Sequence, residues 1–185
     1  MNTSHYRILI LIYCLLAADI TLAEGIEIQS AASRLAGDNY VLDARLEFNV
    51  DPGLTEALEH GVAIMIDVNI VIKRERNWLW DPTVKKETLG FRLEQHPLSN
   101  HYLVTNEDSG ERQQFQNLTD ALSYLGTING HMLINKDILA SDSKYTGKIK
   151  AEVNTETLPA VIRPAAAVSK KWQLNSTWFE WVIKE

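Results

Sequence analysis

The chain contains a single cysteine in 185 residues, and that residue, Cys14, lies within an apolar run near the start of the sequence. The rest of the chain therefore cannot form a disulfide bond, use a thiolate as a nucleophile or bind a metal through cysteine sulfur. A domain of this length needs no such crosslink, because it can bury about 70% of its unfolded surface.

Basic charge is also scarce. The chain has 18 Lys and Arg residues against 24 Asp and Glu residues, a formal net charge of −6, so its overall field is unsuited to holding nucleic acid or anionic lipid. The one basic cluster, Lys73-Arg74-Glu75-Arg76 with Lys85 and Lys86, flanks a predicted turn. We interpret it as a solvated edge rather than a phosphate site.

Strong catalytic motifs are missing. The sequence has no Gly-rich phosphate loop, no Gly-x-Ser-x-Gly elbow and no His-Glu-x-x-His helix. Ser141 and Lys144 have the Ser-x-x-Lys spacing of penicillin-recognising acyl-enzymes, but they precede a predicted strand, whereas that chemistry needs a helix start. His96 and His101 flank a turn without a third ligand at metal-site spacing. We predict no enzymatic activity, no cofactor and no metal site.

The first 23 residues have the order of a secretory signal peptide. Arg7 supplies a short basic start, residues 8–18 are almost wholly apolar, and Thr21-Leu22-Ala23 ends the segment with a small-x-small pattern. We predict cleavage after Ala23, which removes Cys14 and leaves residues 24–185 as a single domain. The alternative is an uncleaved N-terminal anchor, although a bilayer span needs about 20 apolar residues. No later segment is apolar enough to cross a membrane.

Alternation of apolar and polar residues with a period of two dominates the remainder and predicts strands. In the clearest strand, 62–72, every even-numbered residue is Val or Ile. Further strands are predicted at residues 26–35, 40–50, 83–95, 101–106, 145–154 and 178–183, with another near Phe115. Their one-sided apolar faces are typical of antiparallel sheets packed on a core.

Two short helices are predicted between the strands. The apolar residues of 54–58 share one helical face before Gly61, and residues 118–125 repeat this pattern before Gly126. The residues suited to starting them are Asp51 or Thr55 for the first helix and Asn117 or Thr119 for the second. We therefore predict a mainly β protein, an antiparallel β-sandwich of about eight or nine strands with two short helices.

All five tryptophans fall in two places. Trp78 and Trp80 lie just beyond the strand 62–72, and the other three crowd residues 172–181. Packing is the expected role of the C-terminal group. Its strand carries large apolar side chains on both faces, which predicts that the strand is covered on both sides. The first group lies beside charged residues and a proline turn. We predict that its residues form a binding surface for a glycan or an extended peptide, with packing as the alternative. The predicted contact residues are Trp78, Leu79, Trp80 and Asp81.

Several of these features together resemble one protein family. They are the Leu-x-x-Ala-Leu-x-x-Gly segment at residues 54–61, the long strand after it, Trp-x-Trp-Asp at 78–81 and Ser-x-Trp-Phe-x-Trp at 176–181. This order is similar to an uncharacterised proteobacterial family, domain-of-unknown-function family 4390, over nearly the whole chain after the signal peptide. The resemblance implies an exported Gram-negative protein with no assigned activity and a partner in envelope signalling.

These features predict a periplasmic, non-enzymatic binding module for a protein or cell-envelope component. We expect a monomer that binds no nucleic acid and has no stable membrane insertion after cleavage. One alternative is an envelope hydrolase or glycan-processing enzyme, which would need the strand-face carboxylates of Asp43, Glu47 and Asp67 to meet in a cleft. Another is a structural envelope subunit that pairs with another chain through an exposed edge strand.

Overall fold

The computed structural model describes residues 25–76, 80–140, 142–168, 172 and 174–183. Its strands are β1 (Gly25–Ala36), β2 (Asn39–Asn49), β3 (Ile64–Arg74), β4 (Thr83–Gln95), β5 (Tyr102–Asn106), β6 (Arg112–Phe115), β7 (Thr127–Asn135), β8 (Tyr145–Val153) and β9 (Phe179–Ile183). Its helices are α2 (Pro52–Glu59), α3 (Leu118–Leu125) and α4 (Arg163–Val168), with 3-10 turns η1 (Lys136–Ile138) and η2 (Thr155–Thr157).

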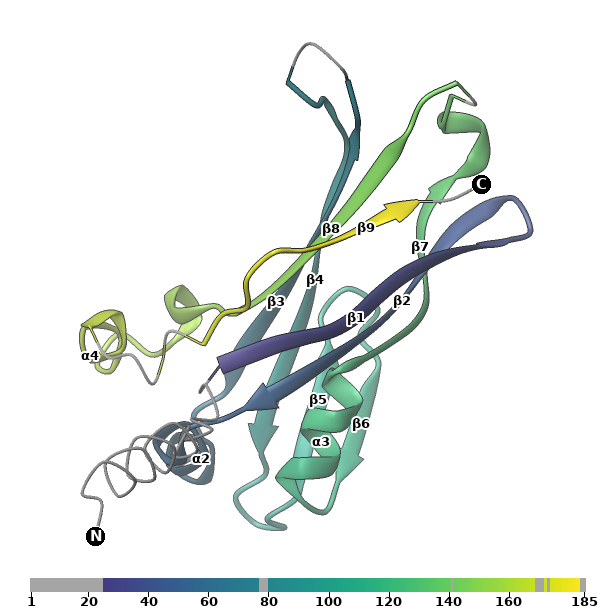
Figure 1. The fold of residues 1–185 in the computed structure, drawn as a ribbon. Coiled ribbons are helices and arrows are strands. Elements are labelled where there is room, and N and C mark those ends of the chain that lie inside the picture. Colours follow the sequence, from purple (N-terminus) through teal and green to yellow (C-terminus); the bar gives the residue numbers. More distant parts are fainter. Residues whose placement is uncertain (1–24, 77–79, 141, 169–171, 173, 184–185) are drawn as a thin grey trace, which may run out of the picture.

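The strands of the described residues form two antiparallel sheets. The small sheet has the order β1-β2-β7 and the large sheet the order β6-β5-β4-β3-β8-β9. Figure 1 shows the β1–β2 hairpin packed across the large sheet, with α3 beside β5 and β6 and with β9 beside β1. The predicted mainly β, antiparallel two-sheet fold is confirmed, with nine strands in this part of the chain. The two predicted helices are α2 and α3, and α4 was not predicted.

The core lies between the two sheets, on the faces that the alternation indicates. The inward residues of β3 are at most 2% exposed, namely Ile64, Ile66, Val68, Ile70 and Ile72. Their partners from the small sheet are the buried residues Tyr40, Leu42, Ala44 and Leu46 of β2. Because successive side chains of a strand point to opposite faces, a period of two is enough to predict which residues are buried.

Both predicted helices begin at a side-chain cap. The Asp51 side chain accepts a hydrogen bond from the backbone N–H of Gly53 at 2.6 Å, and the Asn117 side chain accepts one from that of Asp120 at 2.8 Å. α3 ends at Gly126, whose carbonyl oxygen accepts a hydrogen bond from a backbone N–H of β2. Among the described residues, no helix combines the length and apolar character needed to cross a membrane.

Strand β7 was not predicted, because two bulges interrupt its pairing with β2. At one of them the consecutive residues Leu133 and Ile134 are both buried. Near the other, Gly130 adopts a φ of 65°. A bulge places two residues against one on the partner strand, so the alternation that reveals a strand in the sequence is lost.

Strand β9 differs from its prediction, because only one of its faces is covered. Trp181 and Ile183 are buried, but Val182 is 54% exposed and Glu180 is exposed. The buried face is filled by the indole of Trp181, which lies against Gly147, its directly opposite residue on β8. A position without a side chain on β8 thus makes room for the largest side chain of β9.

Candidate functional site

Trp80 and Asp81, two of the four predicted contact residues, lie between β3 and β4, the two strands that extend to the top of Figure 1. The Asp81 carboxylate accepts a hydrogen bond from the backbone N–H of Arg76 at 2.9 Å, which joins the two sides of the loop. The neighbouring Trp80 is 93% exposed. Trp78 and Leu79, the other two predicted contact residues, lie outside the described residues.

The tryptophans that the structure describes have different environments. Trp172 and Trp181 are buried, as predicted for the C-terminal group, but Trp178 in the same group is 45% exposed. Trp80 makes no use of its large apolar surface in folding. An indole kept almost wholly in water is suited to contact with a partner, because such contact would remove most of that surface from water.

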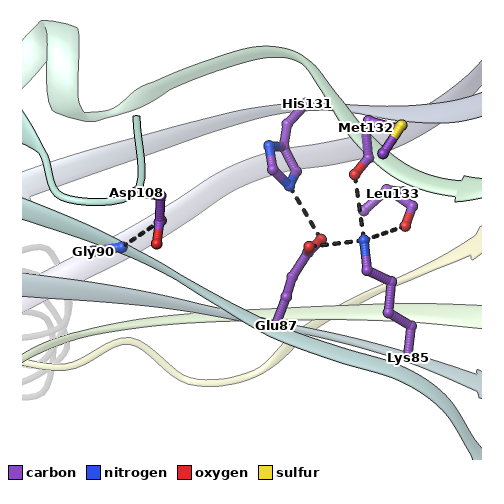
Figure 2. Close-up of polar contacts among 7 residues, drawn as sticks. All are labelled: Lys85, Glu87, Gly90, Asp108, His131, Met132 and Leu133. Carbon is purple, nitrogen blue, oxygen red and sulfur yellow. Dashed lines mark hydrogen bonds and ion pairs between the residues drawn. The ribbon is translucent and has the colours of Figure 1, made fainter. Parts of the chain in front are cut away.

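The structure also forms a polar cluster that was not predicted from the sequence, shown in Figure 2. Lys85 and Glu87 occupy core-facing positions of β4 and reach the edge strand β7. The Lys85 ammonium donates hydrogen bonds to the carbonyl oxygens of Leu133 at 2.5 Å and Met132 at 3.4 Å, and it lies 2.8 Å from Glu87 Oε2. The other Glu87 oxygen lies 3.1 Å from His131 Nε2.

This cluster binds the two sheets to each other. An ammonium group has three N–H donors, and the three acceptors around Lys85 use all of them, which leaves none for a ligand. Two of these acceptors belong to β7, which is the last strand of the small sheet. We call Lys85, Glu87 and His131 the inter-sheet clamp. Its signal in the sequence is the pair of charged residues that interrupts the apolar face of β4 before Leu89, because charges on a core-facing position need partners.

Replacing Lys85 with methionine is expected to destabilise the protein by about 1–2 kcal/mol, because two carbonyl oxygens and Glu87 lose a partly buried donor. Lys86→Met is the matched control, since Lys86 is exposed and faces the other side of β4. It should change stability by less than about 0.5 kcal/mol. Urea unfolding followed by tryptophan fluorescence measures both effects. Equal unfolding midpoints for the two variants would contradict the clamp.

The three carboxylates of the hydrolase alternative do not meet. Asp43 and Glu47 lie on β2 in the small sheet, whereas Asp67 lies on β3 in the large sheet, and all three point away from the core. Asp67 accepts a hydrogen bond from Asn154 at 2.9 Å, and Glu47 accepts one from Gln29 at 2.8 Å. These residues therefore do not form the paired-carboxylate arrangement that general acid–base catalysis requires.

Asp43 instead supports one of the bulges of β7. One of its carboxylate oxygens accepts a hydrogen bond from Arg34 Nε and the other accepts one from the Gly130 N–H, both at 2.7 Å. The Arg34 bond, followed by the Gly130 bond, lowers the pKa of Asp43 from its ordinary 3.8. Both bonds favour the ionised form. Their contribution to folding is therefore present above the ordinary pKa and is lost as pH falls through the lowered pKa of the folded state.

The two histidines of the predicted turn do come together. His96 and His101 line a pocket of about 170 Å³ with Leu103, Ser99 and Gln114, and the backbone N–H of His96 donates a hydrogen bond to the backbone carbonyl oxygen of His101 at 2.8 Å. No group of three or more His, Cys, Asp or Glu side chains suited to a metal ion occurs in the part of the chain that the structure describes.

The Ser-x-x-Lys motif falls partly outside the described residues, because Ser141 does. Lys144 is exposed and directly precedes β8. Its carbonyl oxygen accepts a hydrogen bond from the backbone N–H of Glu75 at 2.9 Å. Lys144 thus lies beside the β3–β4 hairpin, in a turn before a strand.

An open apolar groove of about 440 Å³ lies between β2 and α3. Its lining residues are Leu46, Glu47, Phe48, Val50, Leu118, Thr119, Leu122 and Ser123. Only Glu47 among them is ionisable, so the groove lacks the paired acid and base that a hydrolytic site needs.

Fold and site together define an antiparallel two-sheet β protein with an exposed tryptophan at one hairpin. A family model described as Domain of unknown function (DUF4390) matches residues 23–182, so the chain belongs to this family. The match confirms the family that the tryptophan motifs indicate. Neither the curated proteins nor the solved structures contained a match to this chain.

Proposed function

We propose that this protein is an exported, non-enzymatic binding domain that works in the periplasm and contacts a protein or another cell-envelope component. The contact residues are those of the β3–β4 loop, Trp78 to Asp81. The observation that carries the proposal is the 93% exposure of Trp80, in contrast to the buried Trp172 and Trp181. Tryptophan is among the residues that contribute most to binding when a partner covers them.

Export is supported by the sequence of residues 1–23, which lie outside the described residues. The family match begins at residue 23, beside the predicted cleavage site. Residues 24–185 contain no cysteine, so the domain tolerates an oxidising compartment without forming unwanted disulfides.

Two observations favour binding over the alternatives. The carboxylates that a hydrolase would use are divided between the outer faces of two sheets. A structural subunit would need a long free strand edge, but β1 and β9 contact each other and Lys85 occupies two carbonyl oxygens of β7. The remaining edge strand of the described sheets, β6, has four residues.

In-cell photo-crosslinking tests this function. A photo-reactive amino acid placed at position 80 should give a discrete adduct with an envelope component. The matched control is position 98, because Leu98 is also 93% exposed but lies in the turn at the opposite end of β4. The same adduct from both positions would contradict a contact at the β3–β4 loop.

Trp80→Ala should leave the free energy of unfolding within about 0.5 kcal/mol of the parent protein, as should Leu98→Ala, because neither side chain is packed. Urea unfolding measures both. Truncation of a packed aromatic residue costs about 3–5 kcal/mol. A loss of that size for Trp80→Ala would show that Trp80 belongs to the core and would remove this site assignment.

A further inference from the structure

Basic side chains without an acidic partner gather at one end of the large sheet. Six of the described lysines and arginines form ion pairs with carboxylates. Eight do not, and five of these eight lie in the β3–β4 hairpin or in the loop next to it. The five are Lys73, Arg74, Arg76, Lys86 and Lys144.

Strand pairing brings four of these residues to one end of the large sheet, since Arg74 lies opposite Tyr145, the neighbour of Lys144, and Arg76 follows two residues after Arg74. Lys86 lies opposite Val71, two residues before Lys73, so both ammonium groups belong to the outer face of the sheet. The hydrogen bond from the Glu75 N–H to the Lys144 carbonyl oxygen places Lys144 alongside the hairpin. The basic cluster of the sequence analysis therefore changes its membership in the fold: Lys85 is paired with Glu87, and Lys144, from the turn before β8, joins it.

This end of the molecule has a charge opposite to that of the whole. Among the described residues of 73–82, residue 86 and residues 142–144, the carboxylates are those of Glu75, Asp81 and Asp142, against five cations without an ion pair. The full chain has a net charge of −6. An anionic surface consequently attracts the hairpin end and repels the rest of the molecule, which orients the protein with Trp80 toward that surface.

We propose that the β3–β4 hairpin docks on the surface of an anionic phospholipid bilayer, with Trp80 among the headgroups and the five cations against lipid phosphates. The inference rests on the proposed function and names its envelope partner. Tryptophan favours the membrane–water interface, because its ring is apolar and its N–H remains hydrogen-bonded. Lysine and arginine are attracted by the negative surface potential. Such docking is peripheral and requires no spanning segment.

The distribution of the cations favours a bilayer over an acidic protein. Lys73 and Arg74 are consecutive on β3, so their side chains leave the hairpin on opposite faces. A flat surface pressed against the end of the hairpin meets both, together with Trp80. A protein docked against one face of the hairpin would meet only some of these groups.

Vesicle co-sedimentation tests the proposal. We would use the chain from residue 24 onward, because every residue of the described core lies between Ile26 and Ile183. The vesicles are phosphatidylcholine alone, or phosphatidylcholine mixed three to one with phosphatidylglycerol. We expect binding to the anionic vesicles only, and weaker binding as salt is raised, because the Debye length falls from about 30 Å at 0.01 M to about 8 Å at 0.15 M.

Variants locate the contact. Lys86→Ala should weaken vesicle binding about fivefold, and Trp80→Ala roughly tenfold. Arg112→Ala and Leu98→Ala are the matched controls, because Arg112 is an exposed cation without an ion pair on β6 and Leu98 is an exposed apolar residue at the far end of β4. Both controls should bind like the parent, and circular dichroism melting curves verify that all variants are folded.

Equal binding to both kinds of vesicle, or equal losses for Lys86→Ala and Arg112→Ala, would overturn the proposal. The absence of vesicle binding together with a protein adduct at position 80 in cells would overturn the lipid contact and leave the proposed function standing. The absence of both would remove the proposed function as well.

Discussion

Replacing Gly147 with alanine is expected to destabilise the protein by about 2–3 kcal/mol. A Cβ at this position would lie 2.3 Å from two ring carbons of Trp181, far inside van der Waals contact. The indole is 8% exposed and packed in the core, so it cannot move away without opening a cavity. On backbone grounds alone, alanine would be favoured over glycine in a strand by roughly 0.5–1 kcal/mol. The clash costs more than this backbone gain, so the substitution is expected to destabilise the protein.

Urea unfolding measures this effect, with Gly90→Ala as the matched control. Gly90 lies inside β4, where a Cβ would meet the Glu107 side chain at an ordinary 3.5 Å. Its N–H donates a hydrogen bond to Asp108, drawn in Figure 2, which alanine retains. Gly90→Ala should be neutral or slightly stabilising. Repeating Gly147→Ala in a Trp181→Leu background should reduce its cost, and an unchanged cost there would show that the indole is not the cause.

Gly126→Ala is expected to cost about 3 kcal/mol, because a Cβ would lie 2.2 Å from the carbonyl oxygen of Leu46. The backbone angles of Gly126, φ −75° and ψ 0°, are ordinary for alanine. Alanine leaves the unfolded chain fewer conformations than glycine does, which by itself would stabilise the variant by about 0.4–1 kcal/mol. The atom that clashes belongs to the main chain of Leu46 and not to a flexible side chain, so it cannot rotate away. Moreover, the Leu46 N–H is itself hydrogen-bonded to the Gly126 carbonyl oxygen at 2.7 Å.

The control for this second substitution is Ser123→Ala, on the exposed side of the same helix. It should change the unfolding midpoint little, since alanine is a better helix former than serine. Gly126→Ala should also increase amide hydrogen exchange in α3, because the clash separates the end of the helix from β2. Exchange that rises equally for both variants would contradict this contact.

The pattern of the sequence predicted the elements whose signals are local. The strand predicted at 62–72 is β3, displaced by two residues, and each helix cap is one of the two residues proposed for it, because alternation and side-chain capping act within a few residues. Strand β7 was not, because its bulges depend on β2. The double coverage expected for β9 was wrong for a similar reason: Val182 is apolar, but no element of the described chain covers it.

The binding role of the β3–β4 loop stays a prediction. The sequence indicated this loop, and the structure adds that Trp80 is exposed. The inter-sheet clamp could not be predicted, because Lys85 and His131 are 46 residues apart and meet only when β4 faces β7. The separation of Asp43 from Asp67 could not be predicted either, because it follows from the placement of β2 and β3 in different sheets.

The sequence by itself determined the near absence of thiol chemistry, the N-terminal export signal that we predict, the antiparallel β class and the family. These properties depend on composition or on neighbours along the chain. Only the tertiary structure decided which of the described tryptophans are buried, which strand edges are covered, and that cations of β3, of β4 and of the turn before β8 gather at one end of the large sheet. These depend on contacts between distant segments, whose partners are set by the order of strands in the two sheets. An apolar or charged residue has the same chemistry in the core and on the surface, and the fold decides in which of the two it lies.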